Sequence, residues 1–409
     1  MVKKLTDDNK IHDFAQKVTT PFYIYSSDKI IENYNSYAHC LTEIDSLICY
    51  SVKANSNLSI LKMLSNKNSG FDVVSKGEIE RVLLAGGDAE KIVFSGVGKT
   101  MDEIEFGIAK NILCFNVESL DELKSISEVA SSLNKMANIS IRVNPSIDPK
   151  THPYITTGLS ENKFGIHENE IFDAYKMAKD LDNLNIVGID YHIGSQITDL
   201  QPFVDSATKV LEIVHALKEM KINLSHIDVG GGLGIDYDGS QTASIASTNY
   251  SLQNYANDVV ATIKECCESK KIPLPTLITE SGRAIASHFS ILIFNILGIN
   301  SLPSDIPKED EKECLSVRNL RETLVHINSL ELKQEEDLAK LQEAWNDSLK
   351  FKADALAAFR LGYIDLVERA KAEQLTWACA KTIVNQLPKN ILLPKELKKL
   401  SESLAVTYY

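Results

Sequence analysis

Residues 47–55 read Leu-Ile-Cys-Tyr-Ser-Val-Lys-Ala-Asn, an apolar run that ends in a single lysine, Lys53. Aliphatic and aromatic residues in a short run bounded by polar ones predict a buried β-strand. The ammonium group of Lys53 would then leave the strand at its carboxyl end. A lysine in such a place is costly unless something uses its charge. The stretch therefore indicates a buried sheet with a chemical site at its edge.

Seven further runs of the same kind follow along the chain. Between Leu47 and Glu280 they alternate with longer amphipathic stretches, the pattern of parallel strands joined by crossover helices. Eight such units match the size of a TIM-type (β/α)8 barrel, whose active sites form just after the strands' carboxyl ends. The expected strands are Leu47–Val52, Phe71–Val74, Ile92–Ser95, Leu113–Val117, Ile139–Val143, Ile186–His192, Ile227–Val229 and Thr276–Thr279.

Polar side chains stand where these strands end, which favours the barrel over an ordinary α/β sheet. A plain sheet would also place loops there, but it would not need ionisable residues at so many of them. The residues are Lys53, Asp72 with Ser75, Ser95, Asn116 with Glu118, Arg142 with Asn144, His192 with Ser195, Gly230–Gly232, and Glu280 with Arg283.

The chain is expected to contain more than the barrel. Apolar runs at residues 21–25 and Phe289–Ile299 flank it, and both are suited to a small β domain. From Ser301 the composition becomes charged, with apolar residues at helical spacing, which predicts a helical bundle with Trp345 and Trp377 in its core. The expected divisions are 1–45, contributing to the small β domain; 46–284, the barrel; 285–300, a β-domain strand; and 301–409, the bundle.

Composition narrows the class of function. Of 409 residues, 44% are hydrophobic and 24% charged, as in folded globular proteins. A net charge of −13 disfavours nucleic acid or an anionic membrane as partner and leaves a small-molecule substrate. No apolar run follows the N-terminal lysines, so a cytoplasmic protein is expected. Seven cysteines without CxxC spacing indicate reduced thiols, and no metal site is expected.

Lys53 and Gly230–Gly232 are suited to an aldehyde cofactor that carries a phosphate. Desolvation lowers the pKa of an amine, which favours its condensation with an aldehyde. A salt-bridged lysine would give the same local pattern. In Val229-Gly-Gly-Gly-Leu-Gly a strand runs into glycines whose N–H groups can cradle a phosphate, although glycines in such turns also serve packing alone.

Two further motifs add groups suited to a flat, phosphorylated ring. In Glu280-Ser-Gly-Arg, Glu280 can pair with a pyridinium nitrogen and Arg283 can neutralise phosphate, unless the two form a surface salt bridge. His192 can stack on a ring and Ser195 can donate to a phosphate oxygen, while a core histidine is the alternative. Each motif is weak alone, and their order along one barrel makes them specific together.

These residues resemble the fold-type III decarboxylases that use pyridoxal 5'-phosphate (PLP), the family of diaminopimelate, ornithine and biosynthetic arginine decarboxylases. The resemblance implies that Lys53 forms the Schiff-base link and that His192 and Glu280 are catalytic with it. It also implies a small amino-acid substrate and a homodimer. The implied cofactor-binding residues are Lys53, Asp72, His192, Ser195, Gly230, Gly231, Gly232, Glu280, Gly282 and Arg283.

Two members of this family are resembled by different parts of the chain. Residues 20–234 are similar to diaminopimelate decarboxylase, and residues 228–409 to biosynthetic arginine decarboxylase. The first similarity is carried by 50–55 (Tyr-Ser-Val-Lys-Ala-Asn), 70–78, 142–145, 152–158, 163–166 and 192–196, and the second by 236–240, 249–260, 280–285 and 362–374.

The first expectation is decarboxylation of meso-diaminopimelate to L-lysine, and the second is conversion of L-arginine to agmatine in polyamine biosynthesis. In both families a later β-domain segment with a Cys-Glu-Ser-Gly-Asp-like motif and a tyrosine completes the pocket, and the sequence shows neither. A PLP-binding barrel without decarboxylase activity is therefore the third alternative.

Overall fold

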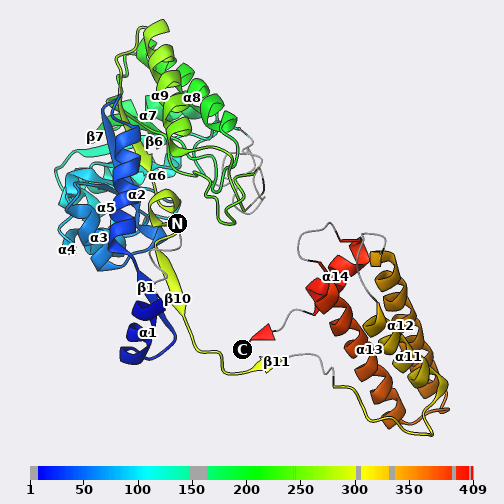
Figure 1. Cartoon of the computed structure of the whole chain (residues 1–409). Helices are drawn as coiled ribbons and strands as arrows, with labels where there is room; N and C mark the ends of the chain where they lie inside the picture. Colours follow the sequence, from blue (N-terminus) through cyan, green and yellow to red (C-terminus); the bar gives the residue numbers. More distant parts are fainter. Residues whose placement is uncertain are drawn as a thin grey trace. The chain divides into compact units, whose positions relative to one another are not determined.

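The computed structural model of the chain describes residues 8–147, 164–242, 244, 246–300, 305–330, 337–388, 393–404 and 407–408. The motif at 152–158 and Lys163 lie outside these residues. The chain divides into two compact units, Met1–Ile293 and Phe294–Tyr409 (Figure 1).

The first unit contains a closed barrel of eight parallel strands, which confirms the predicted fold. The strands follow one another around the barrel in chain order, and β2 pairs with β9 to close it. Their ends agree with the sequence prediction to within two residues. They are β2 (Ser46–Ser51), β3 (Gly70–Val73), β4 (Ile92–Phe94), β5 (Cys114–Val117), β6 (Ala137–Arg142), β7 (Leu184–Asp190), β8 (His226–Asp228) and β9 (Thr276–Glu280).

Helices surround the barrel, and one of them comes from before its first strand. Helix α2 (Ser27–Cys40) packs against both α3 and α9, where a helix after β9 would lie, and it buries Ile30, Tyr34 and Tyr37. Only the one-turn helix α10 (Arg283–Ala286) follows β9 directly. Residues 1–45 thus contribute a barrel helix as well as a β strand. The other barrel helices are α3 (Leu58–Ser65), α4 (Lys76–Leu84), α5 (Met101–Lys110), α6 (Leu120–Ser132), α7 (Ile171–Asp180), α8 (Gln201–Glu219) and α9 (Leu252–Ser269).

Side-chain caps fix the starts of several of these helices, at the end of the barrel where the strands finish. Thr100 and Glu103 form a capping box at the start of α5, and Ser251 does the same with Asn254 for α9. Ser75 caps α4 in the same position, immediately after β3. Each cap contributes about 1 kcal/mol to helix stability and holds the loop before the helix in place.

A small antiparallel ribbon lies outside the barrel. Strand β1 (Phe22–Tyr25) pairs with β10 (Ser290–Ile293), so the two apolar runs that flank the barrel in the sequence meet in space (Figure 1). Helix α1 (Asp8–Lys17) precedes the ribbon. The second apolar run does not continue as one strand to residue 299. A separate two-residue strand, β11 (Ile299–Asn300), pairs instead with β12 (Thr407–Tyr408).

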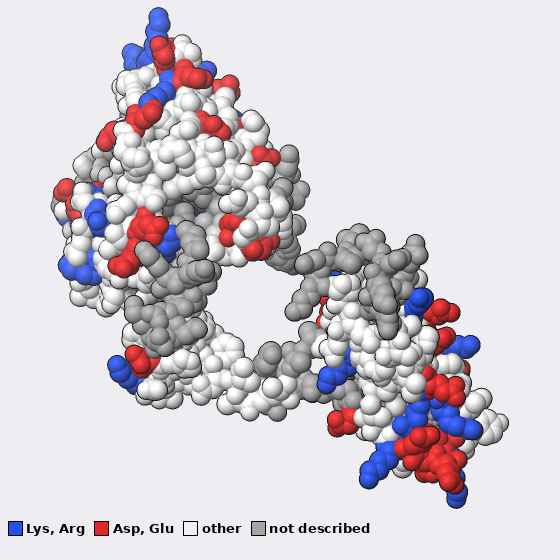
Figure 2. All heavy atoms as spheres, viewed as in Figure 1, with Lys and Arg blue, Asp and Glu red and all other residues white. Residues whose placement is uncertain are grey.

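The second unit is a helical bundle, as predicted. It consists of α11 (Leu315–Ser329), α12 (Asp337–Arg360), α13 (Leu366–Gln386) and α14 (Lys395–Ser403). Trp345 is buried in its core, while Trp377 packs at the edge of the core beneath the ammonium group of Lys352. Acidic and basic side chains are interspersed on the visible face of this unit (Figure 2). Among the described helices, none has the length and apolar character of a membrane span.

Gly188 lies where a side chain would collide with the packed interior of the barrel. The ring of His226 is buried there, and a Cβ atom on Gly188 would lie 2.1 Å from its Nε2. Burial lowers the pKa of His226 to about 4, so the ring is neutral at neutral pH. Cys49 and Cys114 are buried nearby, and all seven cysteines of the chain are free thiols.

We expect Gly188→Ala to destabilise the barrel by about 1–3 kcal/mol, because the added Cβ would lie 2.1 Å from Nε2 of the buried His226 ring, which would have to shift. Gly98→Ala is the matched control, since a Cβ there meets no atom within 4 Å and should change stability by less than about 0.5 kcal/mol. Urea unfolding of both variants measures the difference. Equal stabilities would show that the fit around His226 is not tight.

Candidate active site

Lys53 lies at the barrel's mouth, in a short 3₁₀ helix (Val52–Ala54) that directly follows β2. Its Nζ atom is 2.7 Å from Oδ2 of Asp72, a fully buried residue of the neighbouring strand β3. Half of the Lys53 side-chain surface remains exposed, while its ammonium group is paired with Asp72.

The pKa of Lys53 differs from the sequence-based expectation. Burial lowers the pKa, as expected, but the negative charges of Asp72 and Glu280 outweigh burial and raise it above its ordinary value. The prediction of a lowered pKa is therefore wrong for the protein without a bound cofactor. The prediction failed because the sequence indicates that the strand is buried but does not show that acids lie near Lys53 at the barrel's mouth. The amine is held protonated by Asp72.

Glu280 ends strand β9 and is buried at the mouth of the barrel. Its Oε1 atom accepts hydrogen bonds from Ser95 Oγ at 2.9 Å and from Asn116 Nδ2 at 3.3 Å. Burial, followed by the charge of Asp72, raises the pKa of Glu280 from its usual 4.5 to about 6. The carboxyl can therefore gain or lose a proton near neutral pH.

Two more acids lie next to Glu280 in the barrel interior. Asp190 ends β7 and Asp228 ends β8, and one carboxylate oxygen from each lies within 4.8 Å of an oxygen of Glu280. Burial and the charge of Glu280 raise the pKa of both aspartates well above their ordinary values. Asp228 also accepts the N–H of Gly230 at 2.9 Å, which ties the acids to the glycine-rich turn.

Arg142 supplies the positive charge that faces these acids. It lies at the end of β6, with Nη1 2.7 Å from Oε1 of Glu118 and Nε 3.7 Å from Oδ2 of Asp190. Glu118 in turn accepts the N–H groups of Gly96 and Gly165, each at 3.0 Å, so it joins three loops. The sequence marked Arg142 and Glu118 as polar strand ends but assigned them no role. Their opposite charges on successive strands were the signal that could have paired them.

The glycine-rich turn after β8 packs closely against the rest of the site. Gly230 and Gly232 have φ angles of +65° and +100°, which side chains disfavour, and a Cβ on Gly231 would lie 2.1 Å from the carbonyl oxygen of Glu280. The N–H of Gly231 donates to Nδ1 of His192 at 3.0 Å. Burial, then the charges of Arg142 and Lys53, lower the pKa of His192 well below its usual value. The imidazole is therefore a neutral, flat ring.

Arg283 and Ser195 meet on another side of the mouth. Arg283 begins α10 and donates from Nη2 to Oγ of Ser195 at 2.8 Å. It bonds to hydroxyl groups rather than to Glu280, so the surface salt bridge considered from the sequence does not form. A Cβ on the preceding Gly282 would lie 3.0 Å from Cβ of Ser51 and 3.2 Å from that of Ala54, which lets α10 approach Lys53's loop closely.

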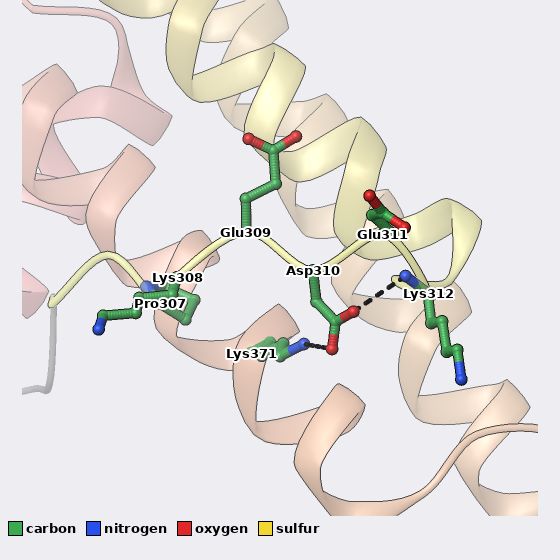
Figure 3. A pocket seen from close by; sticks show the side chains of 7 residues that line it. All are labelled: Pro307, Lys308, Glu309, Asp310, Glu311, Lys312 and Lys371. Atoms are coloured by element: carbon green, nitrogen blue, oxygen red, sulfur yellow. Dashed lines mark hydrogen bonds and ion pairs between the residues drawn. The ribbon is translucent and has the colours of Figure 1, made fainter.

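These contacts bring the predicted site residues to one end of the barrel, although they are spread over more than two hundred positions of sequence. A separate hollow in the helical unit is lined by Pro307, Lys308, Glu309, Asp310, Glu311, Lys312 and Lys371 (Figure 3). It contains none of the predicted residues. Two of its charged groups form an ion pair: Lys371 lies 3.8 Å from Asp310, whose carboxylate also accepts the backbone N–H of Lys312.

The groups at the barrel's mouth fit PLP. The amine of Lys53 suits an aldehyde, the acid Glu280 suits a ring nitrogen, and the glycine turn with Arg283 suits a phosphate. Residues 27–287 match the family described as pyridoxal-dependent decarboxylase, pyridoxal binding domain.

The chain belongs to the pyridoxal-dependent decarboxylases. PLP is accordingly its cofactor, as the sequence predicted. Residues 310–401 match the arginine decarboxylase helical bundle domain.

Relatives of both expected kinds are found. The chain is 49% identical over 294 residues to a biosynthetic arginine decarboxylase of Prochlorococcus marinus, covering 72% of this chain and 45% of the relative. It is 42% identical over 299 residues to the diaminopimelate decarboxylase of Haemophilus influenzae, covering 73% and 69%. The structure of diaminopimelate decarboxylase from Helicobacter pylori complexed with L-lysine has 40% identity and a TM-score of 0.64, covering 77% and 75%.

The two similarities overlap along the chain. A match of 294 residues is longer than residues 228–409, so the likeness to arginine decarboxylases extends into the barrel. The comparisons do not favour diaminopimelate decarboxylase over arginine decarboxylase. The chain spans about half the length of the curated arginine decarboxylases that it matches first.

The raised pKa of Glu280 predicts a specific dependence of stability on pH. Because the folded state binds this proton more tightly than the unfolded state, the stabilisation is greatest below pH 4.5 and is lost as the pH rises through about 6. The difference in unfolding free energy between the wild type and Glu280→Gln should therefore fall by about 2 kcal/mol over this window. Urea unfolding at several pH values measures it. A difference that stays constant or rises would contradict the assignment.

Proposed function

We propose that the barrel's mouth is the PLP site of an amino-acid decarboxylase and that Lys53 is the residue that attaches the cofactor covalently. The observation that carries the proposal is the Lys53–Asp72 ion pair at 2.7 Å, because it places the amine of a half-exposed lysine side chain beside a buried acid. Glu280 also contributes to the high pKa of this amine. Ser195 and Arg283 supply hydroxyl and guanidinium groups for the phosphate.

The chain's own residues divide the work of holding the cofactor. Ser195 and Arg283 would bind the phosphate, the glycines Gly230–Gly232 and Gly282 would let it approach the backbone closely, and the neutral ring of His192 would offer a flat surface to the cofactor ring. Asp72 would accept the proton of the Lys53 ammonium when the amine reacts and would return it when the amine is released. Lys53 must lose that proton before it can react, so cofactor binding and proton transfer to Asp72 are linked.

Glu280 controls the proton on the cofactor's ring nitrogen. Ser95 and Asn116 both donate to Oε1 of Glu280, so Oε2 is the atom that we assign to the ring N–H. When bound, PLP supplies an electron-accepting ring that takes up the electron pair left as carbon dioxide departs. Removing the acid at position 280 would weaken this acceptance because the ring nitrogen would lose its partner.

For the substrate, we propose L-arginine, which would be converted to agmatine. The observation that favours arginine is the second unit, α11–α14, which corresponds to the helical bundle named for arginine decarboxylase. The second candidate is meso-diaminopimelate, which is supported by the 40% identity to a solved diaminopimelate decarboxylase. We further propose that the active enzyme is a homodimer.

We expect Lys53→Ala to lose covalent PLP attachment completely, because no other described side chain places an amine beside Asp72. Borohydride reduction of the PLP-loaded wild type, followed by peptide mass spectrometry, should locate the cofactor on Lys53. Lys124→Ala is the control, since Lys124 is an exposed lysine on the outer helix α6 and should leave attachment unchanged. A cofactor-modified peptide that does not contain Lys53 would show that PLP attaches at another residue.

Carbon dioxide release from PLP-loaded protein distinguishes the functions. We expect release from L-arginine and little from meso-diaminopimelate, and Glu280→Gln should reduce the rate at least about tenfold. Release from meso-diaminopimelate alone would establish the second candidate. Release from neither, with PLP attached to Lys53, would indicate a cofactor-binding barrel that does not decarboxylate these amino acids.

A further inference from the structure

Tyr237 contacts Arg283 at the mouth of the barrel, and it is not among the residues predicted from the sequence to form the site. It lies in the loop that follows the glycine-rich turn. Its Oη atom accepts a hydrogen bond from Nη1 of Arg283 at 2.7 Å, and the guanidinium carbon lies 5.9 Å from the centre of its ring. Half of Tyr237 is exposed. One aromatic residue thus holds Arg283 by a hydrogen bond and by a cation–π contact.

The guanidinium group of Arg283 can bind an anion through two donors on one edge, Nε and Nη2. Nη1 lies outside this edge, so the contact with Tyr237 leaves the edge for another ligand. Tyr237 holds Nη1, and Ser195 accepts from Nη2. The Nε of Arg283 is buried and has no hydrogen-bond partner within the described part of the chain. A buried donor without an acceptor is costly, and an oxyanion that bridges Nε and Nη2 is the ligand that such an edge binds best.

Tyr237 is itself held in place by its loop. Its backbone N–H donates to the carbonyl of Ala246 at 2.8 Å, and its ring packs 5.8 Å from the ring of His288. The neighbouring Asp236 accepts from the N–H of Gly239 at 3.0 Å and from Oγ of Ser247 at 2.7 Å. The carbonyl of Asp236 also lies 3.1 Å from Nε2 of His288. A loop closed on itself in this way can fix the direction from which Tyr237 approaches Arg283.

We propose that Tyr237 is a positioning residue for phosphate recognition: it holds Nη1 of Arg283 so that the Nε and Nη2 edge is presented to the phosphate of PLP. The inference rests on the proposed PLP site and adds a residue that acts on the phosphate alone. Tyr237 does not need to touch the cofactor to act, because its effect passes through the orientation of Arg283. The role therefore distinguishes a phosphorylated ligand from the same ring without phosphate.

The test compares the dissociation constants of PLP and of pyridoxal, which lacks the phosphate, for the full-length wild type and Tyr237→Phe. Absorbance titration follows attachment to Lys53 for both ligands. We expect PLP to bind roughly five- to tenfold more weakly to Tyr237→Phe, the change that follows loss of one hydrogen bond to a charged group. Binding of pyridoxal should be unchanged. Tyr363→Phe is the matched control, because Tyr363 is an exposed residue of the helical unit.

The possible outcomes distinguish the role of Tyr237 from the proposed PLP site itself. An equal loss for PLP and pyridoxal would mean that Tyr237 supports the loop in general, which overturns the inference. Unchanged PLP binding in Tyr237→Phe, with tight binding by the wild type, would overturn it as well while leaving the PLP site intact. No attachment of either ligand to the wild type would refute the proposed function itself. Thermal unfolding of the variant should match the wild type, since the ring and its packing remain.

Discussion

Buried negative charge at the mouth of the barrel is the constraint that organises the site. Asp190, Asp228 and Glu280 end the successive strands β7, β8 and β9, Asp72 lies on β3, and all four have almost no contact with solvent. Acids so close together cannot all be ionised unless cations or protons compensate them. Arg142 provides one fixed positive charge, and Lys53 provides another. The remaining charge is relieved by protons, which is why the pKa values of Glu280 and both neighbouring aspartates are raised.

This balance explains why Lys53 is protonated. Lys53 contributes a positive charge that the acids need, and Asp72 holds it at hydrogen-bond distance. Attachment of Lys53 to an aldehyde would change that charge, so the acids around it would have to respond. Glu280, with a pKa of about 6, can do so by gaining or losing a proton near neutral pH. The same carboxyl is suited to hold the proton of a cofactor's ring nitrogen, so charge balance and chemistry depend on one residue.

The groups that we propose bind phosphate differ in kind from the acids. They are the hydroxyl of Ser195, the guanidinium of Arg283 and the glycine-rich turn, where the absence of side chains allows close approach to the backbone. The turn and the acids are directly linked, because the N–H of Gly230 donates to Asp228. A ligand that carries both a cationic ring nitrogen and a phosphate would find a partner for each charge at the mouth. Tyr237 contacts Arg283 there without adding charge.

The sequence by itself determined the barrel, the helical bundle and most of the residues at the mouth. Short apolar runs each ended in a polar residue, and the carboxyl ends of parallel strands must meet at one end of a barrel. Lys53, His192, Glu280 and the glycine-rich turn were found from this rule alone. These features are local, because a few consecutive residues determine both the pattern of a strand and the position at which it ends.

Only the tertiary structure decided which groups face each other across the mouth. The place of α2 as a barrel helix, the Arg142–Glu118 pair and the Arg283–Tyr237 contact join residues from separate elements, and no local pattern specifies them. Whether the pKa of Lys53 is raised or lowered depends on Asp72 and Glu280, which lie on the two strands that flank β2. Electrostatic effects sum over distance in space rather than along the chain, so the sequence identified the charged groups but not the sign of their combined effect.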